Sequence, residues 1–175
     1  MVNNFVPQTL GIFAWRVVRG RIPVRLELEK RGNDLNSVRC PVCDNALEYV
    51  DHIILDCNLS KDTWNRICRW WGFPSFNNPK IDAVFRLDNG NLFSSEGQKA
   101  WQAVKWVCGY LLGKNRNQIF FHNKFKTSAD VFNDIQIKSF EWISRRARKL
   151  SIEWHQWLLN PGFYLDTNLQ RTGIG

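Results

Sequence analysis

The sequence lacks the apolar segments that a secretory signal or a membrane span requires. Its N-terminus shows no basic stretch followed by an apolar run, and the longest apolar stretch, residues 101–113, is too short to cross a bilayer and contains Lys105. Only five cysteines occur, and three of them lie with a histidine between positions 40 and 57, an arrangement that suits a reducing compartment. We therefore expect a protein of the nucleus or cytoplasm with no membrane partner.

Clustered carboxylates are also missing. A nuclease or another hydrolase would need such a cluster, or a metal ion with an open coordination position, and the sequence suggests neither. We therefore predict that the chain is not an enzyme, and a hydrolase is the least favoured interpretation.

Positive charge and aromatic residues are abundant instead. The net charge is +8, with nine tryptophans and twelve phenylalanines among 175 residues. An excess of basic over acidic residues favours polyanionic partners such as nucleic acid. The alternative is a soluble protein that simply carries extra lysines.

Apolar residues recur at helical spacing in most of the chain, while no strand pattern and no internal repeat is visible. In the clearest case Trp64, Ile67, Cys68 and Trp71 follow the i, i+3, i+4, i+7 pattern, with Ser60 as the expected N-cap. The pattern predicts an all-α fold with helices over 7–19, from Pro23 to the stop at Gly32, from 60 to the stop at Gly72, over 95–122 and over 128–158.

The tryptophans at helical spacing are expected in the core, and the remaining ones are candidates for exposure. The expected core set is Trp64, Trp71, Trp101 and Trp142. The candidates for exposure are Trp70, Trp106 and Trp157.

Four residues form the pattern C-x2-C-x8-H-x4-C: Cys40, Cys43, His52 and Cys57. Three cysteines and one histidine are a closed ligand set of the kind that Zn²⁺ prefers in structural sites, with no position left for a catalytic water. The alternative is a disulfide and two unrelated residues. Cys68 and Cys108, on apolar helix faces, are expected to be core thiols.

The domain organisation follows from these patterns. We predict a zinc-binding helical domain over residues 1–75, a linker or hinge over 76–94, a hairpin of two long helices over 95–160 and an irregular tail over 161–175. The linker is rich in Asn, Pro, Gly and Asp, and its one apolar piece lies around residues 81–87.

The order of motifs around the cysteines resembles the reverse transcriptase zinc-binding domain of plant LINE-type retrotransposon polyproteins. The resemblance covers about residues 5–75, and residues 114–117 with Phe120 resemble an element that often follows this domain. The residues that carry the main match are Phe13, Ala14, Trp15, Arg16, Arg21, Ile22, Pro23, Leu28, Arg31, Gly32, the segment 40–43, Glu48, Asp51, His52, Cys57 and Trp64.

The resemblance implies a zinc-dependent module that works beside a polymerase and contacts nucleic acid. The polymerase itself is missing, because the closest string to a paired-aspartate motif, residues 163–166, is followed by Thr167 instead of a second aspartate. We therefore predict either an excised domain or a standalone derivative of a retrotransposon protein.

Our leading hypothesis is a zinc-stabilised module that binds RNA or DNA through backbone charge. A protein–protein interaction module is the alternative, with the same helices presenting an aromatic groove to a protein partner. The candidate nucleic-acid contacts are Arg16, Arg19, Arg21, Arg25, Arg39, Arg66, Arg69, Lys138, Arg145, Arg148 and Lys149.

Overall fold

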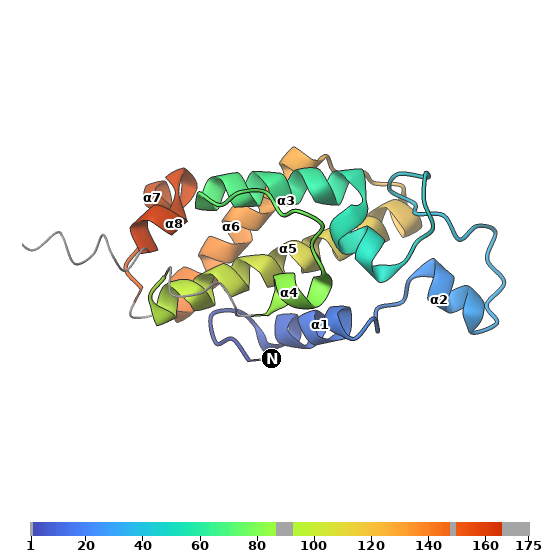
Figure 1. Cartoon of the computed structure of the whole chain (residues 1–175), viewed down its shortest axis with the longest axis horizontal. Coiled ribbons are helices and arrows are strands. Elements are labelled where there is room, and N and C mark those ends of the chain that lie inside the picture. Colours follow the sequence, from blue (N-terminus) through green and yellow to red (C-terminus); the bar gives the residue numbers. More distant parts are fainter. Residues whose placement is uncertain (1, 87–92, 148–149, 166–175) are drawn as a thin grey trace, which may run out of the picture.

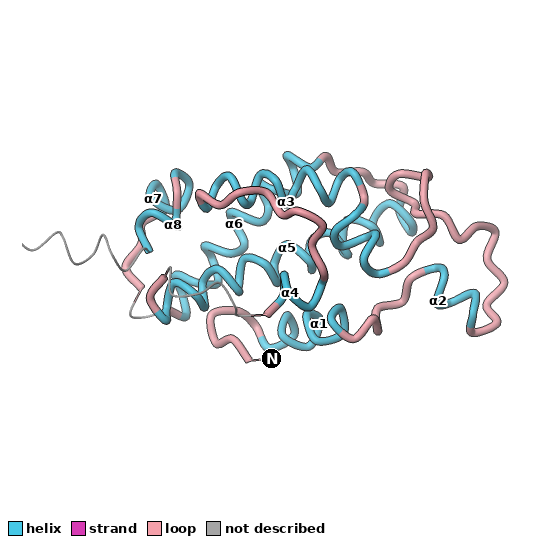
Figure 2. Tube along the Cα trace, in the orientation of Figure 1, coloured by secondary structure: helices cyan, strands magenta, loops and turns pink. Residues whose placement is uncertain are grey.

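Helices make up nearly all of the regular structure. The computed structural model describes residues 2–86, 93–147 and 150–165, and Figure 2 draws no strand among them. Arg39 and Leu47 form an isolated antiparallel bridge. The predicted all-α fold is confirmed. The helices are α1 (Gln8–Val18), α2 (Arg25–Lys30), the π-helix η1 (His52–Asp56), α3 (Asn58–Trp71), α4 (Ile81–Phe85), α5 (Ser95–His122), α6 (Ser128–Arg146), α7 (Trp154–Leu159) and α8 (Pro161–Leu165).

The long helix α5 runs through the middle of the molecule, with α1, α4, α6 and η1 packed around it (Figure 1). Every residue from 100 to 109 is buried, because a central helix meets neighbours on all sides. Gly109 allows one of these contacts, since a Cβ there would lie 2.5 Å from the ring of Phe85. Lys105 is buried as well, and its Nζ donates to the carbonyl of Arg86 at 2.7 Å. No helix in the described part of the chain is long and apolar enough to cross a membrane.

The predicted linker contains the short helix α4. Its residues Ile81, Val84 and Phe85 are buried, and they belong to the same hydrophobic cluster as residues of α1, α3 and α5. The predicted domain limits stay a prediction. Dividing the chain into separate domains at this linker would split the hydrophobic core that α4 shares with α1, α3 and α5.

The predicted helix over 128–158 is wrong, because α6 ends at Arg146 and α7 begins only at Trp154. An unbroken helix would carry Trp157 roughly 16 Å beyond the end of α6, at 1.5 Å per residue. Instead the chain turns back and buries Trp157 completely, and its indole N–H donates to the carbonyl of Gln136 at 3.1 Å. Burial of a tryptophan therefore outweighs continuation of the helix.

The predicted irregular tail is also partly wrong. Residues 161–165 form α8, which starts with Pro161, a residue suited to a first helical position because its missing N–H has no partner to lose there. Gly162 lies so close to α3 that a Cβ would come within 2.3 Å of the Trp71 carbonyl oxygen. Residues 166–175 lie outside the described part of the chain.

Two further expectations need correction. Helix α3 begins at Asn58 with Cys57 as N-cap, and the hydroxyl of Ser60, the predicted cap, instead donates to the Ile53 carbonyl at 2.5 Å. The three tryptophans proposed for exposure, at positions 70, 106 and 157, are buried with each indole N–H bonded to a carbonyl. Trp15 and Trp154 are the exposed ones instead. Trp64, Trp71 and Trp101 are buried as predicted, and Trp142 is half-buried.

Candidate metal centre

The first two cysteines lie in a tight turn at the tip of a short hairpin-like loop. The bridge between Arg39 and Leu47 closes the loop, and the N–H of Cys40 donates to the carbonyl of Ala46 at 2.8 Å. Asp44 follows the turn in the left-handed region, with φ at 49°, and its N–H donates to the carbonyl of Cys40 at 2.8 Å. The turn brings both thiols to the same side, as the two-residue gap predicts.

The other two ligands lie at the two ends of a π-helical turn. In η1 the N–H of Cys57 donates to the carbonyl of His52 at 2.7 Å, an i to i+5 bond that stacks these two residues on successive turns. An ordinary α-helix would rotate them roughly 140° apart, at 100° per residue. The H-x4-C spacing therefore needs the wider turn to aim both side chains at one point.

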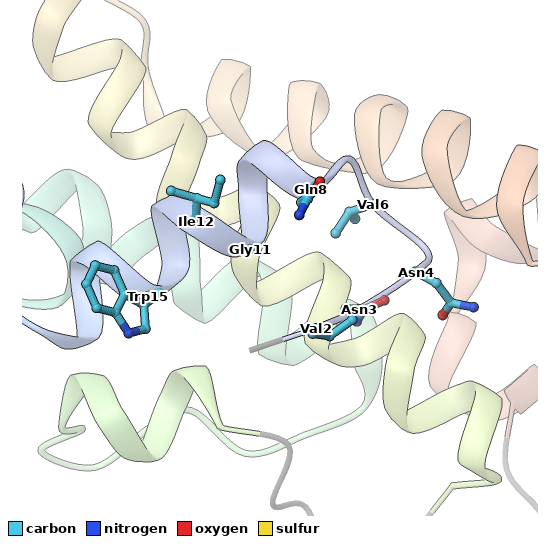
Figure 3. Close-up of a pocket in the computed structure, with 8 residues that line it drawn as sticks. All are labelled: Val2, Asn3, Asn4, Val6, Gln8, Gly11, Ile12 and Trp15. Carbon is cyan, nitrogen blue, oxygen red and sulfur yellow. The ribbon is translucent and has the colours of Figure 1, made fainter.

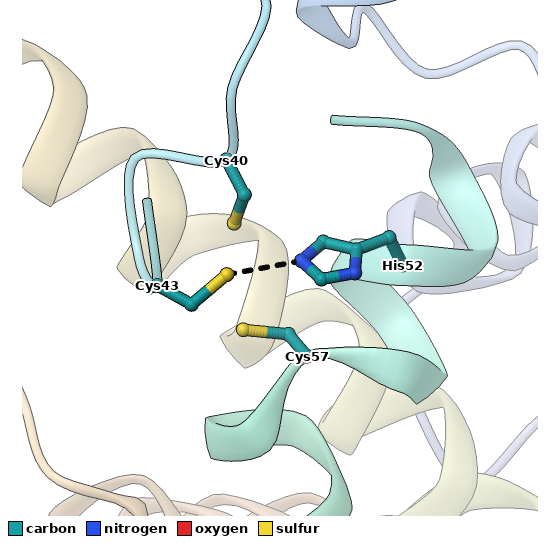
Figure 4. Close-up of side chains that lie close together, drawn as sticks. All are labelled: Cys40, Cys43, His52 and Cys57. Atoms are coloured by element: carbon teal, nitrogen blue, oxygen red, sulfur yellow. Dashed lines mark hydrogen bonds between the residues drawn. The ribbon is translucent and has the colours of Figure 1, made fainter. Parts of the chain in front are cut away.

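The four side chains point toward one another (Figure 4). Their ligand atoms all lie within 4.8 Å of one another, and the Cys43 Sγ is 3.3 Å from the His52 Nε2. A tetrahedral zinc ion with sulfur ligands at about 2.3 Å requires separations of about 3.8 Å, so small side-chain movements suffice to hold one. Cys40, His52 and Cys57 are buried and Cys43 is half-buried. The chemistry and geometry of the set fit a closed metal site.

Backbone dipoles favour thiolates in this pocket. The Cys57 thiol donates a hydrogen bond to Cys40, which lowers the pKa of Cys40 and raises that of Cys57; the backbone N–H groups of Cys43 and Val42 lower the pKa of Cys40 further. The backbone N–H of Leu59 also favours the thiolate of Cys57, which caps the N-terminus of α3. The net effect lowers the pKa of Cys40 and raises that of Cys57, so a metal ion that binds both sulfurs as thiolates would release the Cys57 proton.

A buried ion pair that sequence reasoning missed lies beside the metal site. Glu48, between Cys43 and His52 in the sequence, is fully buried, and its carboxylate accepts hydrogen bonds from Nε and Nη2 of Arg116 on α5, the first at 3.0 Å. The sequence held one indication of this pair: both residues belong to the motifs that resemble the reverse transcriptase zinc-binding domain, Glu48 in the main part and Arg116 in the element that follows it.

The candidate phosphate contacts fall into unpaired and paired groups. Arg16, Arg19 and Arg21 are exposed and form no ion pair with any described residue, and the Arg21 guanidinium lies 5.3 Å from the centre of the Trp15 ring. Arg69 is exposed near Asp62.

The remaining candidates have partners or lie beyond the described residues. The Nη1 of Arg25 donates to the Arg39 carbonyl at 2.6 Å. Arg66 pairs with Asp62 at 3.0 Å, and Lys138 and Arg145 both pair with Glu141, at 3.0 and 3.1 Å. Arg148 and Lys149 lie outside the described residues.

The fold and the site together define an all-α protein with a closed centre of three cysteines and one histidine. Residues 1–64 match the protein family described as zinc-binding in reverse transcriptase, which confirms the resemblance over this part of the chain. The match ends within α3 and includes all four ligands. No curated protein and no solved structure shows significant similarity to the chain. The plant LINE-type origin stays a prediction.

Proposed function

We propose that the chain is a non-catalytic module that binds RNA or DNA through the phosphate backbone and holds one Zn²⁺ for structural reasons. The observation that carries this proposal is the unpaired positive charge of Arg16, Arg19 and Arg21 on α1 and the turn that follows it. Neutralising phosphates with such side chains releases counterions from the nucleic acid, which drives binding of any sequence.

The surroundings of these arginines strengthen the positive potential. Residues 1–26 contain four arginines and no acidic residue. The short helix α4, which packs against α1, carries one acid, Asp82, and its carboxylate pairs with Arg86 at 3.7 Å. A surface of one sign attracts a polyanion over distances of about 10 Å at moderate salt.

A groove with one aromatic side chain, Trp15, lies along α1, the helix that carries Arg16 (Figure 3). Its volume is about 570 Å³, and the Trp15 side chain forms one wall together with the exposed Ile12. An indole flanked by a guanidinium suits a base or sugar of a bound strand. The lining residues are Val2, Asn3, Asn4, Val6, Gln8, Gly11, Ile12 and Trp15.

The zinc ion in this proposal orders the loop that carries Arg39 and leaves no position for a reacting water. The family description supports zinc as the metal, and the closed ligand set supports a structural role. Descent from the reverse transcriptase of a plant LINE-type retrotransposon is the origin that best accounts for the family match. A nuclear or cytoplasmic location suits both a nucleic-acid partner and reduced cysteine ligands.

The test measures the affinity of the full chain for a fluorescent oligonucleotide at two salt concentrations. Replacing Arg16, Arg19 and Arg21 together by glutamine should weaken binding to unrelated sequences equally, since phosphate contacts carry no sequence information. For single strands the slope of log affinity against log salt should shrink by about 0.7 for each phosphate that the variant no longer neutralises.

The matched control replaces three exposed, unpaired cations elsewhere, Arg31, Lys61 and Lys80, and so removes the same net charge. The control should keep most of the salt slope. Equal losses of affinity in both variants would show that only net charge matters and would remove α1 as the site. A wild-type chain with no measurable affinity at low salt would favour the alternative, a protein-interaction module that uses the same groove.

A further inference from the structure

Three phenylalanine side chains stay exposed where α5 ends and the chain turns toward α6. Phe120 is 39% exposed, Phe121 65% and Phe125 60%. The rings of Phe120 and Phe121 meet edge to face, with centres 4.7 Å apart. Three large exposed apolar side chains within six residues form a patch that a soluble surface normally avoids, so this patch indicates a binding surface.

Cations surround these rings. The guanidinium of Arg25 lies 4.7 Å from the centre of the Phe120 ring, and that of Arg116 lies 5.1 Å from it. Lys124, between Phe121 and Phe125, is exposed and forms no ion pair with any residue that the structure describes.

Acidic groups near this end of α5 are already engaged. No aspartate or glutamate occurs from residue 97 to residue 129. At the start of α6, the Asp130 carboxylate accepts from Thr127 and that of Asp134 pairs with Lys126 at 2.5 Å. Asp62 of α3 accepts from the hydroxyl of Ser128. The nearest cations to the Phe120 ring, Arg25 and Arg116, are thus not paired with these acids of α3 and α6.

The patch adjoins the metal-binding loop. Arg25, which stacks on Phe120, also donates to the carbonyl of Arg39, the residue before the first metal ligand, Cys40. The C-terminal half of α5 accordingly lies beside η1 and the loop before it (Figure 1). Arg25 thus links the Phe120 ring to the loop that carries the first two metal ligands.

We propose that this aromatic–basic surface, made of Arg25, Phe120, Phe121, Lys124 and Phe125, binds unpaired nucleotides of a single strand. Bases stack on the two most exposed rings, Phe121 and Phe125, and the backbone phosphates lie near Lys124 and Arg25. The inference rests on the proposed function and deepens it, because phosphate contacts alone would not distinguish a single strand from a duplex.

Stacking and charge together favour this occupant over a protein. Protein–protein interfaces are also rich in aromatic residues and arginine, but they are depleted of lysine, and here the exposed Lys124 lies between Phe121 and Phe125 in the sequence. Proteins that bind single strands combine a positive surface with aromatic side chains on which successive bases stack, and in a duplex the base faces are already covered by stacking on neighbouring base pairs.

The test compares the full chain with a variant in which Phe121 and Phe125 are both alanine, on oligouridine, oligothymidine and a duplex of equal length. Stacking on an aromatic ring is strong enough that removing two rings should weaken single-strand binding at least about tenfold. Duplex binding and the salt slope should not change, because the rings carry no charge. The two single strands separate RNA from DNA as the preferred partner.

The matched control is Phe163→Ala, which removes a phenylalanine that is 55% exposed from α8, at the opposite end of the molecule in Figure 1. It should bind like the wild type. A second variant, Phe121→Trp, keeps an aromatic surface and should retain single-strand affinity, whereas a weaker affinity there would contradict stacking.

The outcomes separate this inference from the proposed function. If the double variant binds single strands as well as the wild type does, the inference is overturned and backbone binding stands. A parallel decrease in duplex affinity would also overturn it. A wild-type chain that binds no nucleic acid at low salt removes both proposals and leaves a protein as the occupant of this surface.

Photo-crosslinking gives a check that does not depend on any variant. A strand that contains 4-thiouridine, exposed to long-wavelength light on the wild-type chain, should attach within residues 120–125. Attachment only to other peptides would overturn the inference.

Discussion

Glu48 and Arg116, 68 positions apart in the sequence, form a buried ion pair that ties the metal-binding loop to α5. Their side chains are 0% and 7% exposed. The same carboxylate accepts the backbone N–H of Arg25 at 2.7 Å, at the start of α2. One carboxylate therefore fixes the positions of three segments around the metal site.

Removing Arg116 should destabilise the protein strongly. Arg116→Ala leaves the Glu48 carboxylate buried without its counter-ion, and breaking a buried pair in this way costs roughly 3–5 kcal/mol. Urea unfolding of the metal-bound chain measures the change. Arg19→Ala, at an exposed position just after α1, is the control and should stay within about 0.5 kcal/mol of the wild type.

Replacing both partners distinguishes an ion pair from packing. In the double variant Glu48→Gln with Arg116→Met, no charge is left buried, so much of the stability should return. A double variant as unstable as the sum of the two single variants would show that the two residues act independently.

Trp157 should contribute much more to stability than its neighbour Trp154. The ring of Trp157 packs edge to face against Trp70 and Trp71, at 5.2 and 5.8 Å, and its removal should cost about 3–5 kcal/mol. Trp154 is exposed, so Trp154→Ala should cost less than about 1 kcal/mol. Equal effects of the two substitutions on thermal or urea unfolding would contradict the docking of α7.

The parts of the fold that could be predicted depend on neighbours in the sequence. The four predicted ligands lie within 18 positions and the structure brings them together, while the helix over 95–122, with its N-cap and its stop nearby in the sequence, is confirmed. The break after Arg146 has no such local signal, because no glycine or proline occurs between 146 and 154. The position of this break is set by the burial of Trp157 against α3 and α6, and that packing exists only in the tertiary structure.

Both residues of the ion pair beside the metal site appear in the family resemblance, but no local sequence pattern predicts that they pair. A single glutamate in a loop and an arginine on a helix ordinarily remain exposed, and no periodicity links positions 48 and 116. For Phe121 and Phe125 the expected burial is reversed. Their apolar character predicts burial, whereas the structure leaves both exposed, Phe121 in the last turn of α5 and Phe125 after the helix has ended.

Metal content gives the most direct test of the ligand set. Protein purified without a chelator should contain one zinc ion per chain. Cys43→Ser should lower that content sharply, because a hydroxyl replaces a thiolate ligand. Cys68→Ser is the matched control, since Cys68 is a buried thiol of α3 outside the cluster and should leave the zinc content unchanged. A disulfide between Cys40 and Cys43 in the native protein would contradict the site.

Removal of the metal should loosen residues 39–57 far more than the long helices. Zinc-coupled folding in small domains has a free energy of about 10–16 kcal/mol, ample to order such a loop, whereas α5 and α6 keep their own buried contacts. Hydrogen exchange after chelation should show faster exchange over 39–57 and little change in α5. Because Glu48 still holds the loop to Arg116, chelation should free this segment more completely in Arg116→Ala than in the wild type. Unchanged protection of 39–57 after the metal has left would mean that the ion does not order the loop.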